Sequence, residues 1–335
     1  MQIAIDDARR LIEDVMVVQK HSREEAALIA DHLMDCELRG VSFGGLPRAL
    51  SIVERIQGRP DRRKPITVTR ETPASAFVEG NDQTGYLVAH RATKLAIAKA
   101  KQNGVGIVAA NETWYTGMFS YYLEMAARED LVSMAIGNAH PRVAPYGSTE
   151  GRFGTNPIAF GFPSLEDPII WDIGTAAVMA GEVALALRTG APLREGVAYD
   201  EKGNPTRDAA AAGRGAYAVW GGAKGSGLAM CVQMLGMMAN TLPFPPLLAG
   251  CGFLIVCMSP SMFMDIGEFK KNISDYAKAV REAKPIDPAN PVRMPFDRSA
   301  DTRRKTLARG TIEVAEATFQ KLDAVRKDLP VQNSR

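Results

Sequence analysis

Short apolar runs alternate with helix-forming stretches through the middle of the chain, and this alternation restricts the possible folds more than any other feature. Residues 76–79 and 105–110 have the character of strands, and the alanine-rich stretch 88–102 between them has that of a helix. A helical stretch at 121–128 and an apolar run at 132–137 continue the pattern. Because such a chain buries its strands in a sheet covered by helices, we expect an α/β fold.

The N-terminal part differs from this pattern, because its apolar residues recur at helical spacing. A charged, proline-bearing stretch at 60–73 separates it from the rest. We therefore expect an N-terminal helical segment at residues 1–70 and an α/β body at residues 71–330. Two further helices are expected, a buried one at 225–238, where nearly every residue is apolar, and an amphipathic one at 311–329.

The composition is that of an ordinary soluble globular protein, and its 46% of hydrophobic residues suffices for a substantial core. A formal net charge of +2 gives no electrostatic argument for binding nucleic acid or an anionic membrane, so neither is expected as a partner. The cysteines form no CxxC pair, which argues against a zinc site and a disulfide framework. The N-terminus lacks the apolar core of a signal peptide, so we expect a cytoplasmic location without a metal site.

A glycine-rich loop with a single lysine lies at residues 221–227, where the apolar helix begins. A helix N-terminus offers free backbone N–H groups and the positive end of the helix dipole, and Lys224 adds a full charge. This combination suits a pyrophosphate group. It is not a Walker A motif, because Gly225 rather than Ser or Thr follows the lysine. Loops of this kind are common, so the segment alone does not identify a nucleotide site.

Two other segments place polar or small residues at the ends of strands. Thr155 and Asn156 lie in a Gly-Thr-Asn-Pro sequence before an apolar strand, which by itself is more typical of an ordinary turn. Asp172 ends another apolar strand and is followed by small residues, an arrangement that suits a ligand site in α/β proteins. Alternatively, Asp172 only caps the helix that follows it.

A third segment, residues 39–48, bears on substrate binding. It reads Arg-Gly-Val-Ser-Phe-Gly-Gly-Leu-Pro-Arg and places Phe43 and Gly44 shortly before Arg48. An arginine guanidinium can hold a substrate carboxylate through two parallel hydrogen bonds. The alternative for Arg48 is an ordinary position on a helix surface.

Trp114 and Tyr115 follow the strand expected at 105–110. A tyrosine hydroxyl can act as a general acid, but its ordinary pKa of about 10 means that it needs a neighbouring cation to act as a base at neutral pH. Lys224 is a candidate for that cation. Equally, both aromatic residues can form the wall of a pocket without any role in proton transfer.

Taken in order, these segments resemble the malate/L-lactate dehydrogenase family, which lacks a Rossmann fold. Its members include ureidoglycolate, sulfolactate and diketogulonate dehydrogenases and cyclic-imine carboxylate reductases. The resemblance covers nearly the whole chain and is densest over residues 150–230. It implies a mixed sheet flanked by helices, as in a sulfolactate dehydrogenase-like fold, a cofactor that is NAD or NADP, and a homodimer.

The resemblance also assigns roles to individual residues. It implies substrate contacts at Phe43, Arg48, Trp114, Thr155 and Asn156. It implies cofactor contacts at Asp172, Ile173, Gly174, Thr175, Lys224, Gly225, Pro295 and Asp297. Between the last two stands Phe296, where relatives usually have glycine.

The usual catalytic histidines of the family are missing, because Gly44 and Tyr115 occupy their two positions. We therefore assign the catalytic proton to Tyr115 or to His140, which lies just past a strand end in the substrate region. The expected activity is hydride transfer between NAD or NADP and a small 2-oxo or 2-hydroxy acid or a cyclic imine carboxylate.

The missing histidines bear on which substrate is used. An imine can enter already protonated, so its reduction depends less on a strong acid than ketone reduction does. Imine reduction, or reduction of a bulky ketone placed against Phe43 and Trp114, is therefore favoured over plain malate or lactate chemistry. The alternative is a catalytically silent homologue that binds a nucleotide or a small acid without turnover.

Overall fold

The computed structural model describes residues 1–329, which divide into two compact units. One unit combines Met1–Arg62 with the described residues from Arg298 onward, and the other comprises Arg63–Asp297. The break between the units after Arg62 falls inside the charged stretch at 60–73. The division differs from the one expected at residue 70, because the C-terminal residues group with the N-terminal helices and not with the α/β body.

The first unit is mainly helical. Its short strands β1 (Gln2–Ala4) and β11 (Thr311–Glu313) pair antiparallel, which joins the two ends of the described chain. The single helix expected at 311–329 is therefore wrong in its first turn, since these residues form a strand before the last helix begins. The helices of this unit are α1 (Ile5–Val18), α2 (Arg23–Leu38), α3 (Leu46–Gln57), α10 (Asp297–Arg309) and α11 (Glu316–Arg326), with a short 3-10 turn η1 (Ser42–Gly44) before α3.

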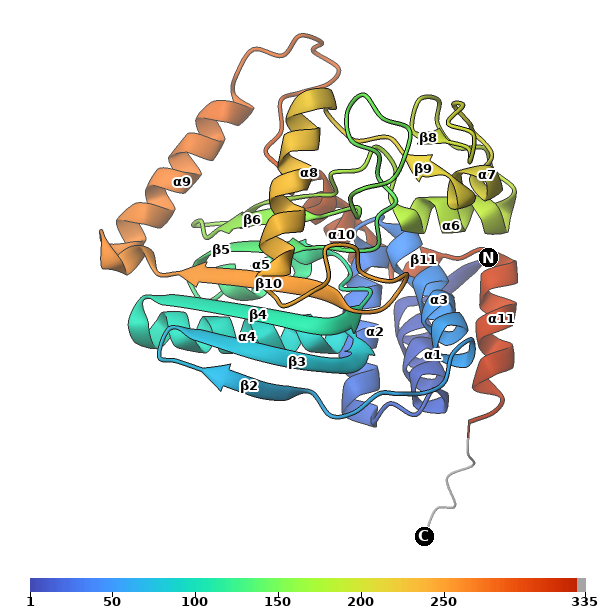
Figure 1. Cartoon of the computed structure of the whole chain (residues 1–335). Helices are drawn as coiled ribbons and strands as arrows, with labels where there is room; N and C mark the ends of the chain where they lie inside the picture. Colours follow the sequence, from blue (N-terminus) through green and yellow to red (C-terminus); the bar gives the residue numbers. More distant parts are fainter. Residues whose placement is uncertain (330–335) are drawn as a thin grey trace. The chain divides into compact units, whose positions relative to one another are not determined.

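The second unit is built on a seven-stranded mixed sheet, which confirms the expected α/β class (Figure 1). Only β3 and β4 run parallel, and every other neighbouring pair is antiparallel. In spatial order the strands are β2 (Thr67–Glu71), β3 (Ser75–Thr84), β4 (Val105–Trp114), β10 (Cys251–Met258), β5 (Val132–Gly137), β6 (Ile158–Phe162) and β7 (Ile169–Ile173).

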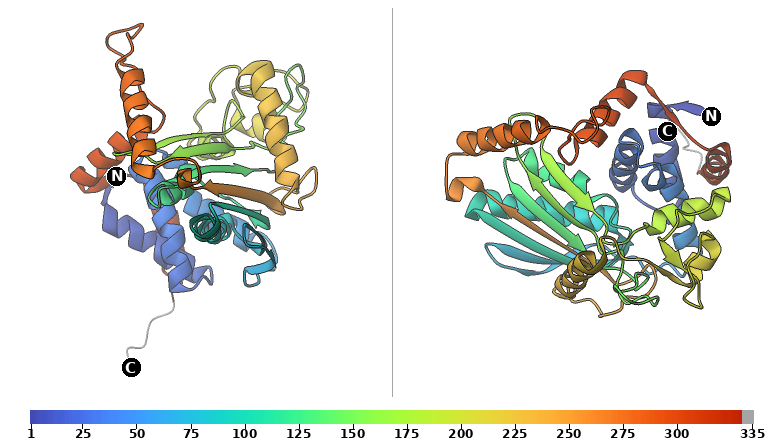
Figure 2. Two further views of the ribbon diagram at one scale, coloured as in Figure 1. Left: turned by 90° about the vertical axis from the view of Figure 1, so that its left-hand side faces the viewer. Right: turned by 90° about the horizontal axis from the view of Figure 1, so that it is seen from above.

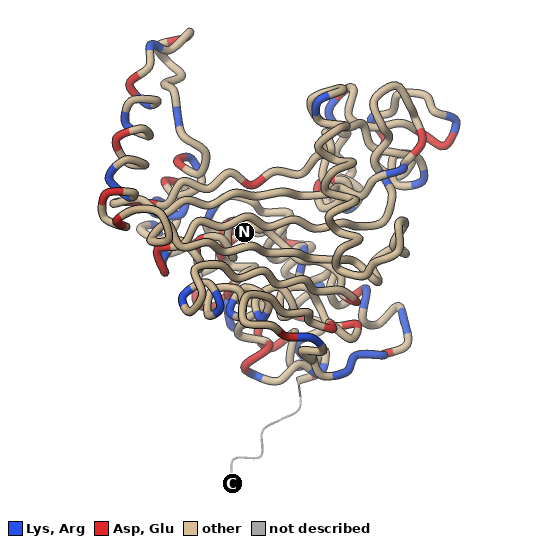
Figure 3. The backbone as a smooth tube through the Cα atoms, turned by 60° about the vertical axis from the view of Figure 1, so that its left-hand side comes forward, with Lys and Arg blue, Asp and Glu red and all other residues tan. Residues whose placement is uncertain are grey.

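Helices cover the two faces of this sheet unequally, as Figures 1 and 2 show. α4 (Gly85–Asn103) and α5 (Phe119–Ala127) pack on one face, and α8 (Gly222–Met237) packs alone on the other, over β5 and β10. The smaller elements of the unit are α6 (Ala180–Thr189), β8 (Ala198–Tyr199), α7 (Ala209–Arg214), β9 (Ala216–Tyr217), η2 (Pro260–Met262) and α9 (Ile266–Arg281). Charged residues concentrate on helices and loops, and the strands of the sheet carry few of them (Figure 3).

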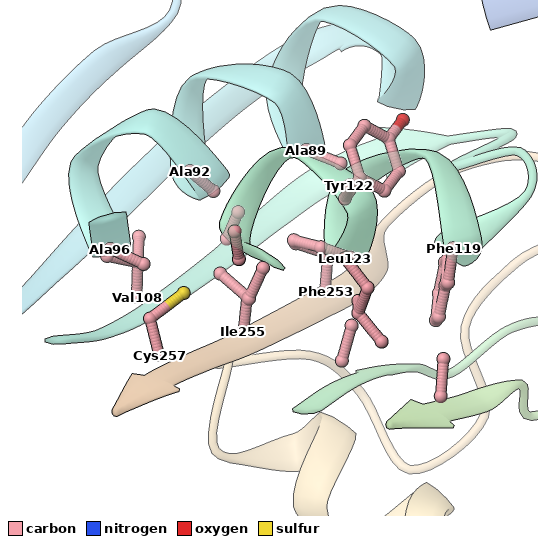
Figure 4. Close-up of a cluster of buried hydrophobic side chains, with 14 of the residues drawn as sticks. Ala89, Ala92, Ala96, Val108, Phe119, Tyr122, Leu123, Phe253, Ile255 and Cys257 are labelled. Atoms are coloured by element: carbon pink, nitrogen blue, oxygen red, sulfur yellow. The ribbon is translucent and has the colours of Figure 1, made fainter. Parts of the chain in front are cut away.

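The main core lies between the sheet and the α4–α5 layer (Figure 4). Small alanines of α4 let this helix lie close to β4 and β10, while the larger side chains of α5 fill the space beside it. Phe119 and Tyr122 of α5 pack edge-on against Phe253 of β10, with ring centroids 5.4 and 5.6 Å apart. The strands and helices that alternate in the sequence thus bury their apolar side chains in one shared core on this face of the sheet.

The helix expected at 225–238 exists as α8, but the expectation that it is buried is wrong. One side packs on the sheet through Val232, and the other side exposes Met230, Met234 and Met238. Apolar content alone does not tell which side of a helix is covered. Among residues 1–329, no helix combines the length and the apolarity needed to cross a membrane. The same residues contain no group of three or more His, Cys, Asp or Glu side chains placed to hold a metal ion.

Candidate functional site

The start of α8 has the geometry of an anion-binding site. Gly221 precedes the helix with φ of +70°, and Lys224 lies exposed in the first turn. The N–H groups of a helical first turn have no partner within their own helix. Gly225 lies directly on the backbone of Trp220, since a Cβ atom added at residue 225 would be only 1.5 Å from the Trp220 carbonyl oxygen. This close approach requires glycine. Lys224 adds a full positive charge beside the unpaired N–H groups of the first turn, where the helix dipole is also positive.

Hydrogen bonds connect this helix to the two turns singled out in the sequence. Asn156 is fully buried, and its Nδ2 donates to the carbonyl of Ala229 in α8 at 2.9 Å. The hydroxyl of Thr175 donates to the carbonyls of Thr155 and Asn156, at 3.2 Å in each case. The carbonyl of Thr175 accepts from the N–H of Trp220 at 2.8 Å. Thr155, Asn156, Thr175 and the start of α8 therefore form one connected frame.

Asn156 itself is placed to hold this frame together. Its φ of +35° is unusual for a residue other than glycine, and its Oδ1 is buried with no hydrogen-bond partner among the described residues. A buried unpaired acceptor costs free energy, on the order of 1–3 kcal/mol. The side chain lies inside the frame, so the direct substrate contact expected for Asn156 stays a prediction.

Asp172 links the frame to a different helix from the one considered in the sequence. Its Oδ2 accepts a hydrogen bond from the N–H of Ser120 at 2.7 Å, in the first turn of α5. Burial raises the pKa of Asp172 to about 6, and the hydrogen bonds from Ser120 and Phe119 oppose that rise. The carboxylate thus caps α5. The neighbouring Ile173 ends β7 opposite Ile158 and packs with the residues below α8.

Gly174 follows β7 directly. A Cβ atom added there would lie 2.3 Å from the sulfur of Met179, so even an alanine requires this flexible side chain to move. Gly174 itself is partly exposed, whereas Thr175 is fully buried, and both the N–H and the carbonyl of Thr175 are hydrogen-bonded within the frame. The cofactor contact predicted at Gly174 is compatible with the partly exposed position of this residue.

Trp114 and Tyr115 lie at the end of β4 but in different surroundings. Trp114 is fully buried, and its indole N–H donates to the carbonyl of Asp82 at 2.9 Å. Tyr115 is partly exposed, has φ of +54° and contacts Trp114 edge-on with ring centroids 5.6 Å apart. Trp114 therefore belongs to the core of this structure. Of the two, Tyr115 is placed to meet a ligand.

His140 follows β5 and is partly exposed. Its Nδ1 lies 3.1 Å from the carbonyl oxygen of Pro245. A carbonyl oxygen only accepts, so this hydrogen bond requires the proton on Nδ1, and the neutral ring then presents Nε2 as an acceptor. In the neutral form His140 can thus receive a proton at Nε2 but cannot donate one from that atom.

Asn138, which the sequence analysis did not identify, fixes the loop that carries His140. Its Nδ2 donates to the hydroxyl of Thr241 at 2.7 Å, and its Oδ1 accepts from the N–H of Gly252, also at 2.7 Å. The side chain is buried and so holds the end of β5, the loop after α8 and the start of β10 together. Its partners are more than a hundred residues away in the sequence, so no local pattern indicates this role.

The third segment predicted to contact the cofactor, Pro295 to Asp297, is held by α9. Asp297 accepts two hydrogen bonds from Arg281 of α9, at 2.7 and 2.8 Å, and another from the N–H of Met294 at 2.9 Å. Arg281 lowers the pKa of Asp297 below its usual range. Phe296 has φ of +80°, a conformation that favours the glycine found in relatives. The carboxylate of Asp297 is engaged by Arg281, and a cofactor contact at Pro295 or Asp297 stays a prediction.

The predicted carboxylate-binding segment belongs to the first unit. Phe43 and Gly44 form η1, and Arg48 lies partly exposed in the first turn of α3. A Cβ atom added at Gly44 would lie 3.1 Å from the sulfur of Cys36, which is closer than an ordinary contact. A histidine at this position would thus require Cys36 to shift.

Glu37 lies next to this segment and was missed in the sequence. Its Oε1 accepts from the N–H of Leu46 at 2.7 Å, at the start of α3, and burial raises the pKa of Glu37 to about 7. Gly45 makes room for it, because a Cβ atom there would lie 2.1 Å from the same oxygen. The only sequence signal is an acid between apolar helix residues, which does not reveal its partner.

Known proteins match this chain along nearly its whole length. The malate/L-lactate dehydrogenase family model matches residues 3–323. The malate/(S)-sulfolactate dehydrogenase of Methanothermus fervidus is 32% identical over 342 residues, covering 99% of both chains. The NAD(+)-dependent ureidoglycolate dehydrogenase of Escherichia coli O157:H7 is 30% identical, covering 96% of this chain and 95% of its own.

Further similarity extends to imine reduction and to solved structures. The Δ1-pyrroline-2-carboxylate reductase of Ancylobacter novellus is 29% identical over 341 residues, covering 97% of both chains. The sulfolactate dehydrogenase structure from Methanocaldococcus jannaschii superimposes with a TM-score of 0.87 at 28% identity, covering 98% of this chain and 97% of that one. The fold and the sequence therefore lead to one family.

Proposed function

Since the chain belongs to the malate/L-lactate dehydrogenase family, we propose that it transfers hydride between NAD or NADP and a small carboxylate substrate, either a 2-oxo or 2-hydroxy acid or a cyclic imine carboxylate. The observation that carries the proposal is the start of α8. Lys224 and the unpaired N–H groups of the first helical turn lie there together, and the backbone at residue 225 packs so closely on Trp220 that only glycine fits. A pyrophosphate is the ligand that this arrangement suits.

The residues present fit a dinucleotide. Lys224 and the first turn of α8 would hold its phosphates, and the partly exposed backbone of Gly174, which carries no side chain, would allow the close approach that a flat ring needs. When bound, the nicotinamide ring supplies or accepts the hydride. The ureidoglycolate dehydrogenase relative uses NAD(+), which supports NAD, while NADP stays open for this chain.

Arg48 would bind the substrate carboxylate, and the Tyr115 hydroxyl would hold the proton that the substrate nitrogen or oxygen exchanges. His140 is the second candidate, because its Nε2 can accept a proton while its Nδ1 is held by Pro245. Trp114 is buried and does not offer the pocket wall considered from the sequence.

Within this activity, we favour reduction of a cyclic imine carboxylate. Gly44 supplies no acid, and a Cβ atom there would lie 3.1 Å from the sulfur of Cys36, so a side chain at this position needs a small shift of Cys36. An imine carbon is already electrophilic when its nitrogen is protonated, so a weak acid such as a tyrosine hydroxyl suffices. Similarity to a Δ1-pyrroline-2-carboxylate reductase supports this preference.

The test follows NADH and NADPH oxidation with oxaloacetate, pyruvate, aryl-pyruvates, Δ1-pyrroline-2-carboxylate and Δ1-piperideine-2-carboxylate. Tyr115→Phe is compared with wild type, and Tyr276→Phe, an exposed tyrosine of α9, serves as the matched control. We expect cyclic imines to be the best substrates and Tyr115→Phe to lower kcat without weakening cofactor binding. Normal turnover of oxaloacetate with no turnover of either imine would refute the preference.

A catalytically silent homologue is the second candidate function, because both family histidine positions lack histidine. It predicts that NADH or NADPH binds, as measured by calorimetry, while no substrate of the panel is converted. The proposal also includes a homodimer and a cytoplasmic location, as the resemblance and the sequence suggested.

A further inference from the structure

The loop between β4 and α5, residues 115–118, carries Tyr115 and has an unusual backbone conformation. Tyr115 has φ of +54° and Gly117 has φ of +76°, so both lie in the left-handed region. Glycine adopts this region freely, but a tyrosine stays there only where its surroundings hold it. The contacts of this loop therefore determine the direction in which the Tyr115 side chain leaves the backbone.

Thr116, the next residue of this loop, is held by two helices. Gly85, the first residue of α4, lies directly against its backbone, since a Cβ atom added at residue 85 would be 2.7 Å from the Cα atom of Thr116 and 2.8 Å from its nitrogen. The second contact comes from α5, where the hydroxyl of Tyr122 donates to the carbonyl oxygen of Thr116 at 2.8 Å. The peptide groups before and after Thr116, the first of which is shared with Tyr115, are thus fixed against α4 and α5.

Tyr122 is itself firmly placed. Its side chain is fully buried, and its ring packs edge-on against Phe253 and Tyr121, with ring centroids 5.6 Å apart in both cases. Figure 4 shows the ring among apolar side chains of the core, with the hydroxyl oxygen at the edge of this group. A phenylalanine would fill the same apolar space, and a buried hydroxyl costs free energy unless it is hydrogen-bonded. The hydroxyl of Tyr122 therefore serves the loop and not the packing of the core.

The helix that carries Tyr122, α5, is in turn fixed to the segment predicted to contact the cofactor. The N–H of Ser120, in the first turn of α5, donates to Asp172 near the end of β7, and Gly174 follows two residues later. The same helix packs against β5, β6 and β7. A single helix thus joins the loop of Tyr115 to the strand end from which the predicted cofactor contacts extend.

We propose that Tyr122 is a positioning residue for proton transfer, because it holds the loop that places the Tyr115 hydroxyl beside the substrate. The inference rests on the proposed function, in which Tyr115 holds the exchanged proton. Tyr122 is fully buried, so it acts through the backbone of Thr116 and does not itself touch the substrate. A proton donor has to lie within hydrogen-bond distance of the atom that it protonates, so a displacement of about 1 Å lowers the rate steeply.

The test replaces Tyr122 by phenylalanine, which removes only the hydroxyl group. Tyr121→Phe is the matched control, because it makes the same change at the neighbouring, partly buried residue of α5. Both variants are compared with wild type on the substrate of the panel that wild type reduces fastest. We expect Tyr122→Phe to lower kcat on the order of tenfold and to change the dissociation constant of the cofactor by less than about twofold, while Tyr121→Phe keeps both values.

A double-mutant cycle with Tyr115→Phe distinguishes positioning from a general loss of folding. If Tyr122 acts through Tyr115, adding Tyr122→Phe to Tyr115→Phe should change kcat by less than about twofold. An equal loss in both backgrounds, or an unchanged kcat in Tyr122→Phe alone, would overturn the positioning role and leave hydride transfer intact. A wild type that converts no substrate of the panel overturns the proposed function, and the positioning role with it.

Hydrogen exchange tests the same support without any turnover. The backbone N–H groups of residues 115–118 are followed by mass spectrometry in wild type and in both single variants. We expect them to exchange on the order of fivefold faster in Tyr122→Phe than in wild type, because the loop loses its hydrogen bond to α5, and to be unchanged in Tyr121→Phe. Protection in Tyr122→Phe equal to that of wild type would mean that the loop keeps its position without the hydroxyl, and the inference would be wrong.

Discussion

Replacing Asp172 by asparagine tests the electrostatics of the site directly. The carboxylate has a pKa of about 6 in the folded protein against an ordinary value of 3.8, and burial is the main cause. The folded state therefore holds a proton more tightly than the unfolded state does. Stability from this group is fully present below pH 3.8, falls as the pH rises and is lost above about pH 6. The difference corresponds to on the order of 3 kcal/mol.

Asparagine keeps the oxygen that accepts from the N–H of Ser120 but carries no charge. We therefore expect Asp172→Asn to raise the free energy of unfolding at pH 8 by about 1–3 kcal/mol and to change it little at pH 4. Urea unfolding followed by fluorescence at several pH values between these limits gives the curve for both proteins. The variant should lack most of the decline that wild type shows between pH 4 and pH 6.

Asp297→Asn is the control with the opposite sign. Arg281 lowers the pKa of Asp297, so its contribution to stability is present above the ordinary pKa and is lost as the pH falls. This substitution should destabilise the protein at pH 8. A loss of stability in Asp172→Asn at pH 8, or a decline with pH equal to that of wild type, would refute the reasoning on Asp172.

Three further predictions concern packing, hydrogen bonding and titration. Gly225→Ala should destabilise the protein by about 3 kcal/mol or more and abolish cofactor binding in a calorimetric titration, because the added Cβ would meet a backbone carbonyl. Gly227→Ala is the control on the same helix. Its Cβ meets open space, so it should leave stability unchanged or raise it by up to about 1 kcal/mol. Asn138→Ala should lower the free energy of unfolding in urea by about 1–3 kcal/mol, since it leaves the buried N–H of Gly252 unpaired; an unchanged midpoint would contradict the role given to Asn138. Glu37→Gln keeps the acceptor for the N–H of Leu46 and removes the carboxylate. Because the pKa of Glu37 is raised to about 7, wild type loses stability as the pH rises toward 7. The variant should therefore have a higher melting temperature than wild type at pH 8 but not at pH 4.

The sequence predicted elements well where a local period determines them. The helix at 88–102 and the strand at 105–110 lie inside α4 and β4, because alanine content and apolar runs are local properties. Sheet order was not predictable in the same way. β10 lies between β4 and β5 although far from both in the chain, and apolar runs do not specify their neighbours.

The candidate site shows the same limit. Lys224 and Gly225 were identified because a glycine-rich helix start has a local signature. The hydrogen bond from Ser120 to Asp172 joins residues 52 apart in sequence, so the sequence suggested a ligand site or a cap on the next helix and not this cap on α5. Trp114 and Tyr115 are adjacent aromatics that burial separates, and no pattern in the sequence indicates which of them is inside.

Direct hydride transfer is the central claim, and the most direct measurement uses NADH and NADPH carrying deuterium on the transferable position of the nicotinamide ring. The protein is incubated with either cofactor and Δ1-pyrroline-2-carboxylate, and the amino acid product is examined by mass spectrometry. The account predicts one deuterium at the carbon next to the carboxylate, from at least one of the two cofactors. Product without deuterium, or bound cofactor with no product from this imine or from any 2-oxo acid, would contradict it.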